Sequence, residues 1–212
     1  TEKYLKPKPE EVLITTAPRD VYAEHPEITR LPVFTEDGYQ NGFSEYTTEL
    51  PAKYHISTRQ PCYGLQFLKA NVPGPTFLQY PKTQDLLERL KSGNYKVLGI
   101  STYTWTLPWA LEFAKLAKER YGIKECWLGS YAVMTEEPLI NKRFDRLFWG
   151  YSENSLREAL GLEPIGLEKL KHPDLTTRSN WLNTRRLIGH TIFQRGCSNR
   201  CVYCADPAFH PG

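Results

Sequence analysis

The sequence predicts an α/β fold, in which a doubly wound parallel sheet carries helices on both of its faces. Short apolar runs rich in β-branched residues alternate along the chain with longer runs of helical periodicity. Glycine or proline separates most of these runs, so the ends of each element are marked. Strands that alternate with helices are typical of βαβ units, whose strands lie parallel.

Six runs have the length and composition of strands. They are residues Glu11–Ala17, Thr76–Tyr80, Tyr95–Ser101, Cys126–Gly129, Asp145–Trp149 and Leu187–Phe193. Pro18 ends the first run, and Gly196 follows the last. The last run is predicted to be a buried strand, because it is short, apolar and rich in β-branched residues.

Four segments are predicted to be helices. They are Gly64–Asn71, Thr83–Gly93, Pro108–Tyr121, and a segment that begins at Ser152 or Asn154 and ends at Gly161. The pattern is strongest in the third segment, because a proline stands in its first turn and Gly122 lies just past its end. Leu111 and Ala114 lie on one face of this helix, and its charged residues lie toward the other.

The composition is that of a globular protein and argues against several classes of function. The chain has 212 residues, a length that suits one to two domains. Hydrophobic residues make up 40% of it and charged residues 24%. No apolar run reaches the roughly 18 residues of a transmembrane helix. The net charge of +3 is spread along the chain, which gives no case for binding nucleic acid or membranes. Because no signal peptide is found either, we expect a cytoplasmic protein.

These patterns divide the chain into four parts. Residues 1–10 are a polar arm, and residues 11–165 form the α/β domain. This domain contains an irregular insertion at about 19–61, where neither strand nor helix periodicity is found. Residues 166–186 are expected to be a linker, and residues 187–212 to begin a second domain.

Three of the five cysteines lie close together, at Cys197, Cys201 and Cys204. Thiolates are soft ligands that select zinc, copper(I) or iron–sulfur clusters. A cubane cluster held by three cysteines keeps one iron open, whereas a structural zinc site is normally closed by four ligands. His210 would supply the fourth ligand of a zinc site. A disulfide is disfavoured, because three clustered cysteines leave one without a partner.

The spacing Cys197-x3-Cys201-x2-Cys204, led by Gln194-Arg-Gly196 and with Tyr203 before the third cysteine, resembles the signature of radical S-adenosylmethionine enzymes. The resemblance implies that the three cysteines hold a 4Fe–4S cluster, whose open iron binds S-adenosylmethionine. It implies that Tyr203 lies near the adenine. In this family an electron from the cluster cleaves S-adenosylmethionine and releases a 5′-deoxyadenosyl radical. A flavodoxin or ferredoxin is the expected electron donor.

In that family the cluster loop follows the first strand of an α/β barrel, which needs on the order of 200 further residues. Few residues follow Cys204 here, so we expect the chain to be the N-terminal part of a longer enzyme. The run at Leu187–Phe193 and the cysteine loop would then be the start of the radical S-adenosylmethionine barrel. The substrate, a small molecule or a peptide, would be bound mainly by the missing part of that barrel.

Three turns of the α/β domain carry a second resemblance. Leu98-Gly-Ile-Ser101 is similar to the strand end after which the tail of a corrinoid is threaded, and Leu128-Gly-Ser-Tyr-Ala132 to a glycine-rich turn. Phe148-Trp-Gly-Tyr-Ser-Glu153 is similar to a Gly-x-Gly-Glu turn that opens the last helix. Together they resemble the Rossmann-like cobalamin-binding domain of cobalamin-dependent radical enzymes. The resemblance implies contacts to cobalamin from Ser101, Gly129 and Ser130.

The chain departs from that family at three places. The Asp-x-His-x-x-Gly motif, whose histidine binds cobalt from below, is absent. Ser130 stands in place of the second glycine, and Ser101-Thr-Tyr103 stands in place of Ser-x-Leu. The resemblance therefore implies that cobalamin binds without a protein histidine. Tyr103 and Trp105 are the candidates to lie against its lower face, and both are equally consistent with packing residues of the core or rim.

The function implied is cluster-dependent reductive cleavage of S-adenosylmethionine, with cobalamin as a second cofactor and methyl transfer to an unactivated centre as the reaction. One alternative is a radical cyclase or rearrangement enzyme whose relic domain binds no cobalamin. Another is a zinc-stabilised binding module that catalyses nothing. The isolated Cys126 is predicted to be a small buried hydrophobic residue.

Overall fold

A computed structural model gives the fold of the chain. It describes residues 4–18, 57–58, 62–181, 184–189, 191–192, 195–197, 199, 201, 204–205 and 209. Most of the insertion predicted at 19–61 lies outside these residues, as does Tyr203.

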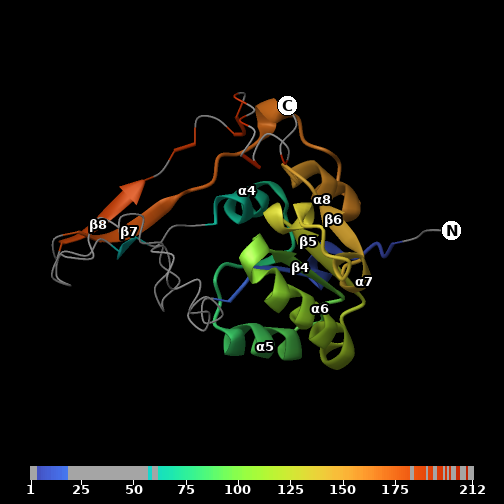
Figure 1. Cartoon of the computed structure of the whole chain (residues 1–212). Helices are drawn as coiled ribbons and strands as arrows, with labels where there is room; N and C mark the ends of the chain where they lie inside the picture. Colours follow the sequence, from blue (N-terminus) through green and yellow to red (C-terminus); the bar gives the residue numbers. More distant parts are fainter. Residues whose placement is uncertain are drawn as a thin grey trace.

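Five parallel strands form the central sheet, in the spatial order β3-β1-β4-β5-β6 (Figure 1). They are β1 (Val12–Thr16), β3 (Thr76–Leu78), β4 (Val97–Ser101), β5 (Glu125–Gly129) and β6 (Arg146–Phe148). The predicted all-parallel α/β sheet is thus confirmed. After β1 the chain first adds β3 on one side of β1 and then β4 on its other side. The strand order therefore reverses between β1 and β4.

Helices cover both faces of this sheet (Figure 1). Helices α4 (Tyr63–Asn71) and α8 (Glu153–Ala159) pack on one face. Helices α5 (Thr83–Ser92), α6 (Leu107–Tyr121) and α7 (Ile140–Arg143) pack on the other. The short 3-10 turns are η1 (Pro9–Glu11), η3 (Thr104–Thr106), η4 (Tyr131–Met134) and η5 (Leu167–Lys169).

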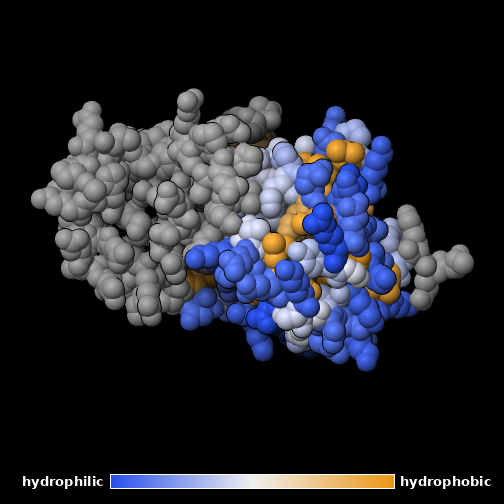
Figure 2. Space-filling model, turned by 90° about the horizontal axis from the view of Figure 1, so that it is seen from below, coloured by the Kyte–Doolittle hydropathy of each residue, from blue (hydrophilic) through white to orange (hydrophobic). Residues whose placement is uncertain are grey.

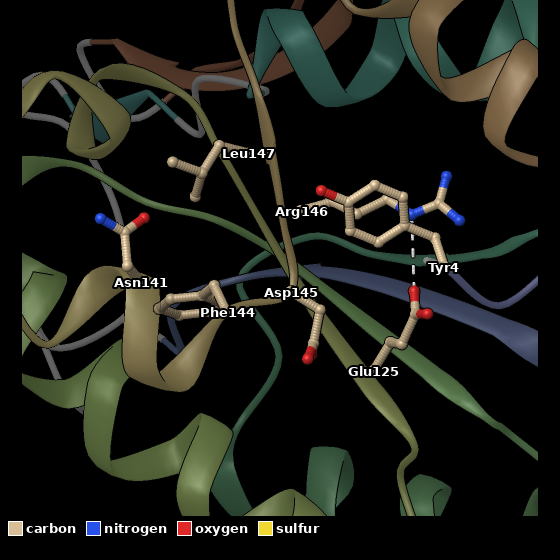
Figure 3. Close-up of a pocket in the computed structure, with 7 residues that line it drawn as sticks. All are labelled: Tyr4, Glu125, Asn141, Phe144, Asp145, Arg146 and Leu147. Carbon is tan, nitrogen blue, oxygen red and sulfur yellow. Dashed lines mark ion pairs between the residues drawn. The ribbon is translucent and has the colours of Figure 1, made fainter. Parts of the chain in front are cut away.

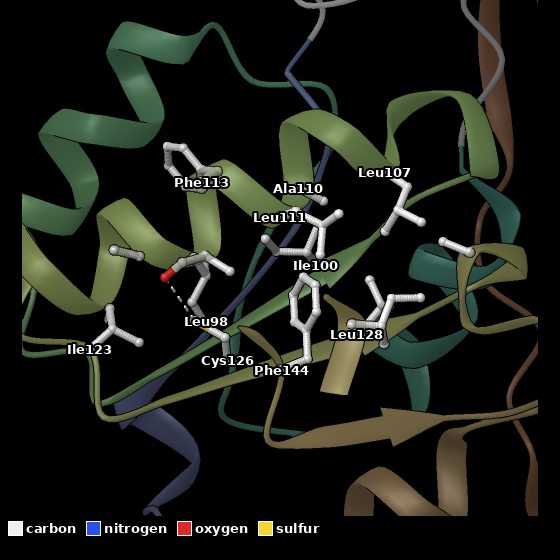
Figure 4. Packing of buried hydrophobic residues seen from close by; sticks show 14 of the residues in the cluster. Leu98, Ile100, Leu107, Ala110, Leu111, Phe113, Ile123, Cys126, Leu128 and Phe144 are labelled. Atoms are coloured by element: carbon white, nitrogen blue, oxygen red, sulfur yellow. Dashed lines mark hydrogen bonds between the residues drawn. The ribbon is translucent and has the colours of Figure 1, made fainter. Parts of the chain in front are cut away.

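Successive residues of each central strand enter two different cores, because side chains alternate across a pleated sheet. In β4, Leu98 and Ile100 belong to the cluster under α5 and α6, where Cys126 is also fully buried (Figure 4). Val97 belongs to the cluster under α4 and α8, together with Trp127. Burial on both faces explains why these strands read as continuous apolar runs.

Helix α6 ends where the sequence predicts. Gly122 has φ +71°, a left-handed conformation that favours glycine, and the following amide of Ile123 donates to the Ala117 carbonyl at 3.3 Å. The outer face of the helix carries exposed charged residues, among them Glu112 and Glu119. Figure 2, which looks onto the α5 and α6 side, accordingly shows a mostly hydrophilic surface over the described residues.

The N-terminal arm is fixed to the domain from Tyr4 onward. The amide of Leu5 donates to the Glu125 carboxylate, and its carbonyl accepts from Nη2 of Arg146 at 2.5 Å. The guanidinium of Arg146 also lies 4.6 Å from the centre of the Tyr4 ring. Two side chains from neighbouring strands therefore pair with the backbone N–H and C=O of one residue of the arm.

The segment expected to be a linker contains a strand instead. Strands β7 (Thr176–Trp181) and β8 (Thr184–Gly189) form an antiparallel hairpin, and β2 (Ser57–Thr58) pairs with β7. The hairpin extends away from the central sheet (Figure 1). The predicted strand at Leu187–Phe193 thus begins earlier, ends at Gly189 and pairs antiparallel. Its β-branched residues favour a strand, but its partner is the polar run before it.

No helix in the described ranges is long and apolar enough to cross a membrane.

Candidate functional site

The carboxyl ends of the central strands are aligned by the register of the sheet. Thr16 of β1 pairs with Ser101 of β4, Ser101 with Gly129 of β5, and Gly129 with Phe148 of β6. In open parallel sheets, ligands bind outside these ends, at the place where the strand order reverses. That place lies between β1 and β4, so the loops after Thr16, Ser101 and Gly129 define the candidate site.

The loop after β4 is tied to the loop after β5 by backbone hydrogen bonds. The amide of Thr102 donates to the Gly129 carbonyl at 3.3 Å, and the amide of Ala132 donates to the Thr102 carbonyl at 3.2 Å. Inside the first loop, the hydroxyls of Thr102 and Thr106 lie 2.5 Å apart. The predicted site residues Ser101, Tyr103, Trp105, Gly129 and Ser130 are therefore brought together at one edge of the sheet.

Ser130 has a backbone conformation that is normal only for glycine. Its φ is 68° and its ψ is −172°, whereas serine at φ above zero is uncommon and this region is essentially restricted to glycine. The position is the one where the sequence analysis noted a serine in place of a second glycine. The turn therefore has the geometry of a glycine-rich turn despite the side chain. Among the described residues, the atom nearest to a Cβ added at Gly129 would be Cβ of Phe148, at 4.0 Å, so this part of the chain leaves that side of the strand end open.

Three aromatic rings lie above this edge in near-parallel orientation. The Tyr103 ring stacks on Trp105, with centroids 4.8 Å apart and planes 12° apart, and lies 6.1 Å from the Tyr131 ring at 13°. Trp105 is 43% exposed, while Tyr103 is partly buried. Of the two candidates for a flat ligand, Trp105 therefore presents the more accessible ring. Burial raises the pKa of Tyr103 to about 12, so its hydroxyl stays protonated at neutral pH.

Cys62 is a residue of this edge that sequence reasoning does not assign to the site. It stands just before α4. Burial raises the pKa of its thiol, and hydrogen bonding with the Leu65 backbone and then with the Ser101 side chain opposes this rise only in part. Cys62 and Ser101 are far apart in sequence, so no local pattern could have paired them.

The three clustered cysteines lie on an irregular segment. Cys197 and Cys204 are exposed, Cys201 is partly buried, and the amide of Cys204 donates to the Cys201 carbonyl at 3.0 Å. Among the residues that the structure describes, no three His, Cys, Asp or Glu side chains are grouped as metal ligands. The donor set, three thiols on one short loop, fits an iron–sulfur cluster, although the sulfur atoms are not gathered around one point in this structure.

The residues on either side of this segment contact the α/β domain. Arg195 forms an ion pair with Glu153 at 2.8 Å, and Phe209 packs against Tyr131 with ring centroids 4.6 Å apart. Glu153 belongs to the turn that resembles Gly-x-Gly-Glu, in which Gly150 has φ 60°. The cysteine segment therefore lies against the same edge of the sheet as the turns after β4 and β5.

A surface pocket of about 650 Å³ lies at the opposite end of the sheet, beside the start of β6 (Figure 3). Arg146 and Glu125 form an ion pair there at 3.5 Å, and Nε1 of Trp127 donates to the Glu125 carboxylate at 2.9 Å. The remaining lining residues are Tyr4, Asn141, Phe144, Asp145 and Leu147. Because both charged groups of the ion pair already bind the arm, this pocket has the character of an arm-docking site rather than of a catalytic centre.

No protein-family model matches the chain, and neither a curated protein nor a solved structure is significantly similar to it.

Proposed function

We propose that this chain is part of a radical S-adenosylmethionine enzyme. The observation that carries the proposal is the spacing Cys197-x3-Cys201-x2-Cys204, together with the contacts that Arg195 and Phe209, on either side of the cysteines, make with the α/β domain. Three thiolates leave one iron of a cubane cluster open, which is what binding of S-adenosylmethionine requires. The protein's cellular location would be the cytoplasm, and its electron donor a flavodoxin or ferredoxin.

In this proposal Cys197, Cys201 and Cys204 hold a 4Fe–4S cluster, and Tyr203 lies beside the adenine. The bound cluster supplies the electron that cleaves S-adenosylmethionine. The exposed positions of Cys197 and Cys204 leave these two thiols accessible to an assembling cluster. The proposed substrate is a small molecule or a peptide.

Cobalamin is the proposed second cofactor, with methyl transfer to an unactivated centre as the reaction. Two observations support it: the glycine-type backbone at Ser130 and the open space beside Gly129. Ser101, Gly129 and Ser130 would then contact the cofactor, and the exposed ring of Trp105 would lie against its flat face. In methyl transfer, cobalamin would carry the methyl group that is donated. Cleavage of S-adenosylmethionine would provide the hydrogen abstraction that prepares the substrate.

The aromatic stack favours a second candidate, a radical cyclase or rearrangement enzyme whose α/β domain is a relic without cobalamin. Tyr103 lies against Trp105 and near Tyr131, so part of the edge at the turn after β4 is filled by protein. Retention of hydroxocobalamin by the purified chain separates the two candidates. Stoichiometric retention that falls in Trp105→Ala supports the methyltransferase, and no retention by a folded chain supports the relic domain.

Spectroscopy of the reconstituted chain tests the radical-enzyme proposal itself. We would load the chain with ferrous iron and sulfide without oxygen, reduce it, and record electron paramagnetic resonance spectra with and without S-adenosylmethionine. A cubane signal that shifts on adding S-adenosylmethionine is expected. The matched controls are Cys201→Ser, which should lose the signal, and Cys62→Ser, which should keep it. Zinc in place of iron would overturn the proposal in favour of a structural module.

A further inference from the structure

Arg195, two positions before the first clustered cysteine, is held by the α/β domain on three sides. Its Nη2 lies 2.8 Å from Oε1 of Glu153, a carboxylate that is only 4% exposed. Its guanidinium carbon lies 4.0 Å from the centre of the Tyr151 ring and 4.4 Å from that of Phe67. A planar guanidinium suits such a position because it stacks on rings while it pairs with a carboxylate.

Phe209, five positions after the last clustered cysteine, is a second contact of the same kind. It is 4% exposed and belongs to the main hydrophobic cluster. Its ring centroid lies 4.6 Å from that of Tyr131 and 6.5 Å from that of Trp149. These partners come from the turns after β5 and β6, and the turn after β5 is one of the loops that define the candidate site.

We infer that Arg195 and Phe209 are positioning residues, which we call the two anchors: they hold the cysteine loop at the sheet edge and so limit the positions from which Cys197, Cys201 and Cys204 must converge on one cluster. This inference rests on the proposed function and adds to it a role for Glu153 as the buried partner of the first anchor. Neither anchor touches the cluster, and both act through the backbone between them.

The physical argument is one of preorganisation. A loop with both ends fixed has fewer conformations to lose when three thiolates converge on one centre, so the bound state is favoured. The exposed Cys197 and Cys204 show that the sulfur atoms themselves are not held by burial. Among the described residues, the side-chain contacts of Arg195 and Phe209 tie this loop to the domain. Because coupling is reciprocal, a bound cluster should also strengthen the docking of the loop.

The test is the rate at which the reconstituted chain loses iron to a chelator. We would compare the wild type with Arg195→Gln and Phe209→Ala under anaerobic conditions, following the absorbance of the cluster. Loss of a supporting contact near a metal site typically costs 10- to 100-fold in affinity, so we expect about tenfold faster loss in each variant. Arg195→Lys keeps the charge but not the stacked plane. Its rate of iron loss should therefore fall between the rates of the wild type and of Arg195→Gln.

Lys118→Gln is the matched control, because it also breaks an ion pair, between Lys118 and Asp145 at 2.7 Å, but at a distance along the sheet from the cysteine loop. It should lose iron at the wild-type rate. Hydrogen exchange of residues 195–209 in the iron-free chain gives an independent readout, and it should be faster in Arg195→Gln than in Lys118→Gln.

The outcomes separate this inference from the proposed function. If the wild type takes up no iron, the proposed function fails. If the wild type binds a cluster but both anchor variants lose iron and exchange amide hydrogens at the wild-type rate, the inference about the anchors fails and the proposed function stands. Circular dichroism of each variant ensures that the comparison is made between folded chains.

Discussion

The ring of Tyr103 lies on the ring of Trp105, with centroids 4.8 Å apart and planes 12° apart. The two residues sit on the loop that follows β4, at the point where the order of the strands reverses. Their contact fixes the position of the one ring, Trp105, that is 43% exposed. The burial of Tyr103 in this stack has a consequence for stability at high pH.

Stability should fall between about pH 10 and pH 12 in part because of Tyr103. Its pKa is about 12 in the folded chain, raised mainly by burial, against an ordinary value near 10. In this window Tyr103 ionises in the unfolded state first, so the unfolded state binds fewer protons and the free energy of unfolding decreases as pH rises. We would measure the free energy of unfolding by urea at about pH 9 and about pH 11.5. It should decrease less between these pH values in Tyr103→Phe than in the wild type.

The matched control for this measurement is Tyr121→Phe, which removes a tyrosine at the end of α6, away from the aromatic stack. If Tyr103→Phe and the wild type lose equal stability between the two pH values, the hydroxyl of Tyr103 does not titrate as its burial implies.

Substitution of Ser130 by glycine should stabilise the protein. The backbone at φ 68° and ψ −172° costs a residue with a side chain on the order of 1–3 kcal/mol, and the extra freedom of glycine in the unfolded chain offsets about 0.5–1 kcal/mol of the relief. We expect a net gain of about 1 kcal/mol in the free energy of unfolding for Ser130→Gly, measured by urea denaturation.

Ser155→Gly provides the comparison, because Ser155 has ordinary helical geometry inside α8. That substitution should cost about 0.5 kcal/mol. Equal destabilisation by both glycine substitutions would contradict the backbone geometry found at Ser130.

The central sheet could be predicted from the sequence because its inner strands β1, β4 and β5 are buried on both faces. Each of these strands reads as a short apolar run, and the buried Trp127 and Cys126 of β5 are adjacent in such a run. The edge residues Ser101 and Gly129 could be named in advance, since strand ends in a parallel sheet meet at one edge.

The contacts that depend on long sequence separation could not be predicted. The Leu5 amide and its acceptor Glu125 are 120 positions apart, and neither neighbourhood carries a signal for the other. The hairpin of β7 and β8 was missed for a different reason. Its first strand, Thr-Thr-Arg-Ser-Asn-Trp, is mostly polar and lacks the apolar alternation that marks a half-buried strand.

Replacement of Arg146 by glutamine should release the N-terminal arm. The substitution removes the donor to the Leu5 carbonyl and leaves the Glu125 carboxylate, which is 8% exposed, without its ion pair. A buried charge that loses its partner costs about 2 kcal/mol or more. We expect a loss of about this size on urea unfolding, with faster hydrogen exchange in a peptide covering residues 4–11.

Lys96→Gln is the control for the arm, because it breaks a more exposed ion pair, between Lys96 and Glu11 at 2.6 Å. Such a pair is worth about 0.5 kcal/mol, so this variant should unfold close to the wild type. An Arg146→Gln chain with wild-type exchange in the arm would show that the arm is held by its other contacts.

The reactivity of the thiols gives a further prediction that needs no cofactor. Cys126 is fully buried, its Sγ donates to the Ala114 carbonyl at 3.6 Å, and burial raises its pKa to about 12. Because the thiolate is the reactive form, Cys126 should resist a disulfide reagent at about pH 8 until the chain unfolds.

The exposed Cys197 and Cys204 should react in the native chain, and a reconstituted cluster should protect both. Mass spectrometry of the labelled peptides separates the sites, with the chain unfolded in urea as the reference for full labelling. Rapid native labelling of Cys126 would contradict its place in the core, and unchanged labelling of Cys197 and Cys204 after iron loading would show that these thiols do not hold the metal.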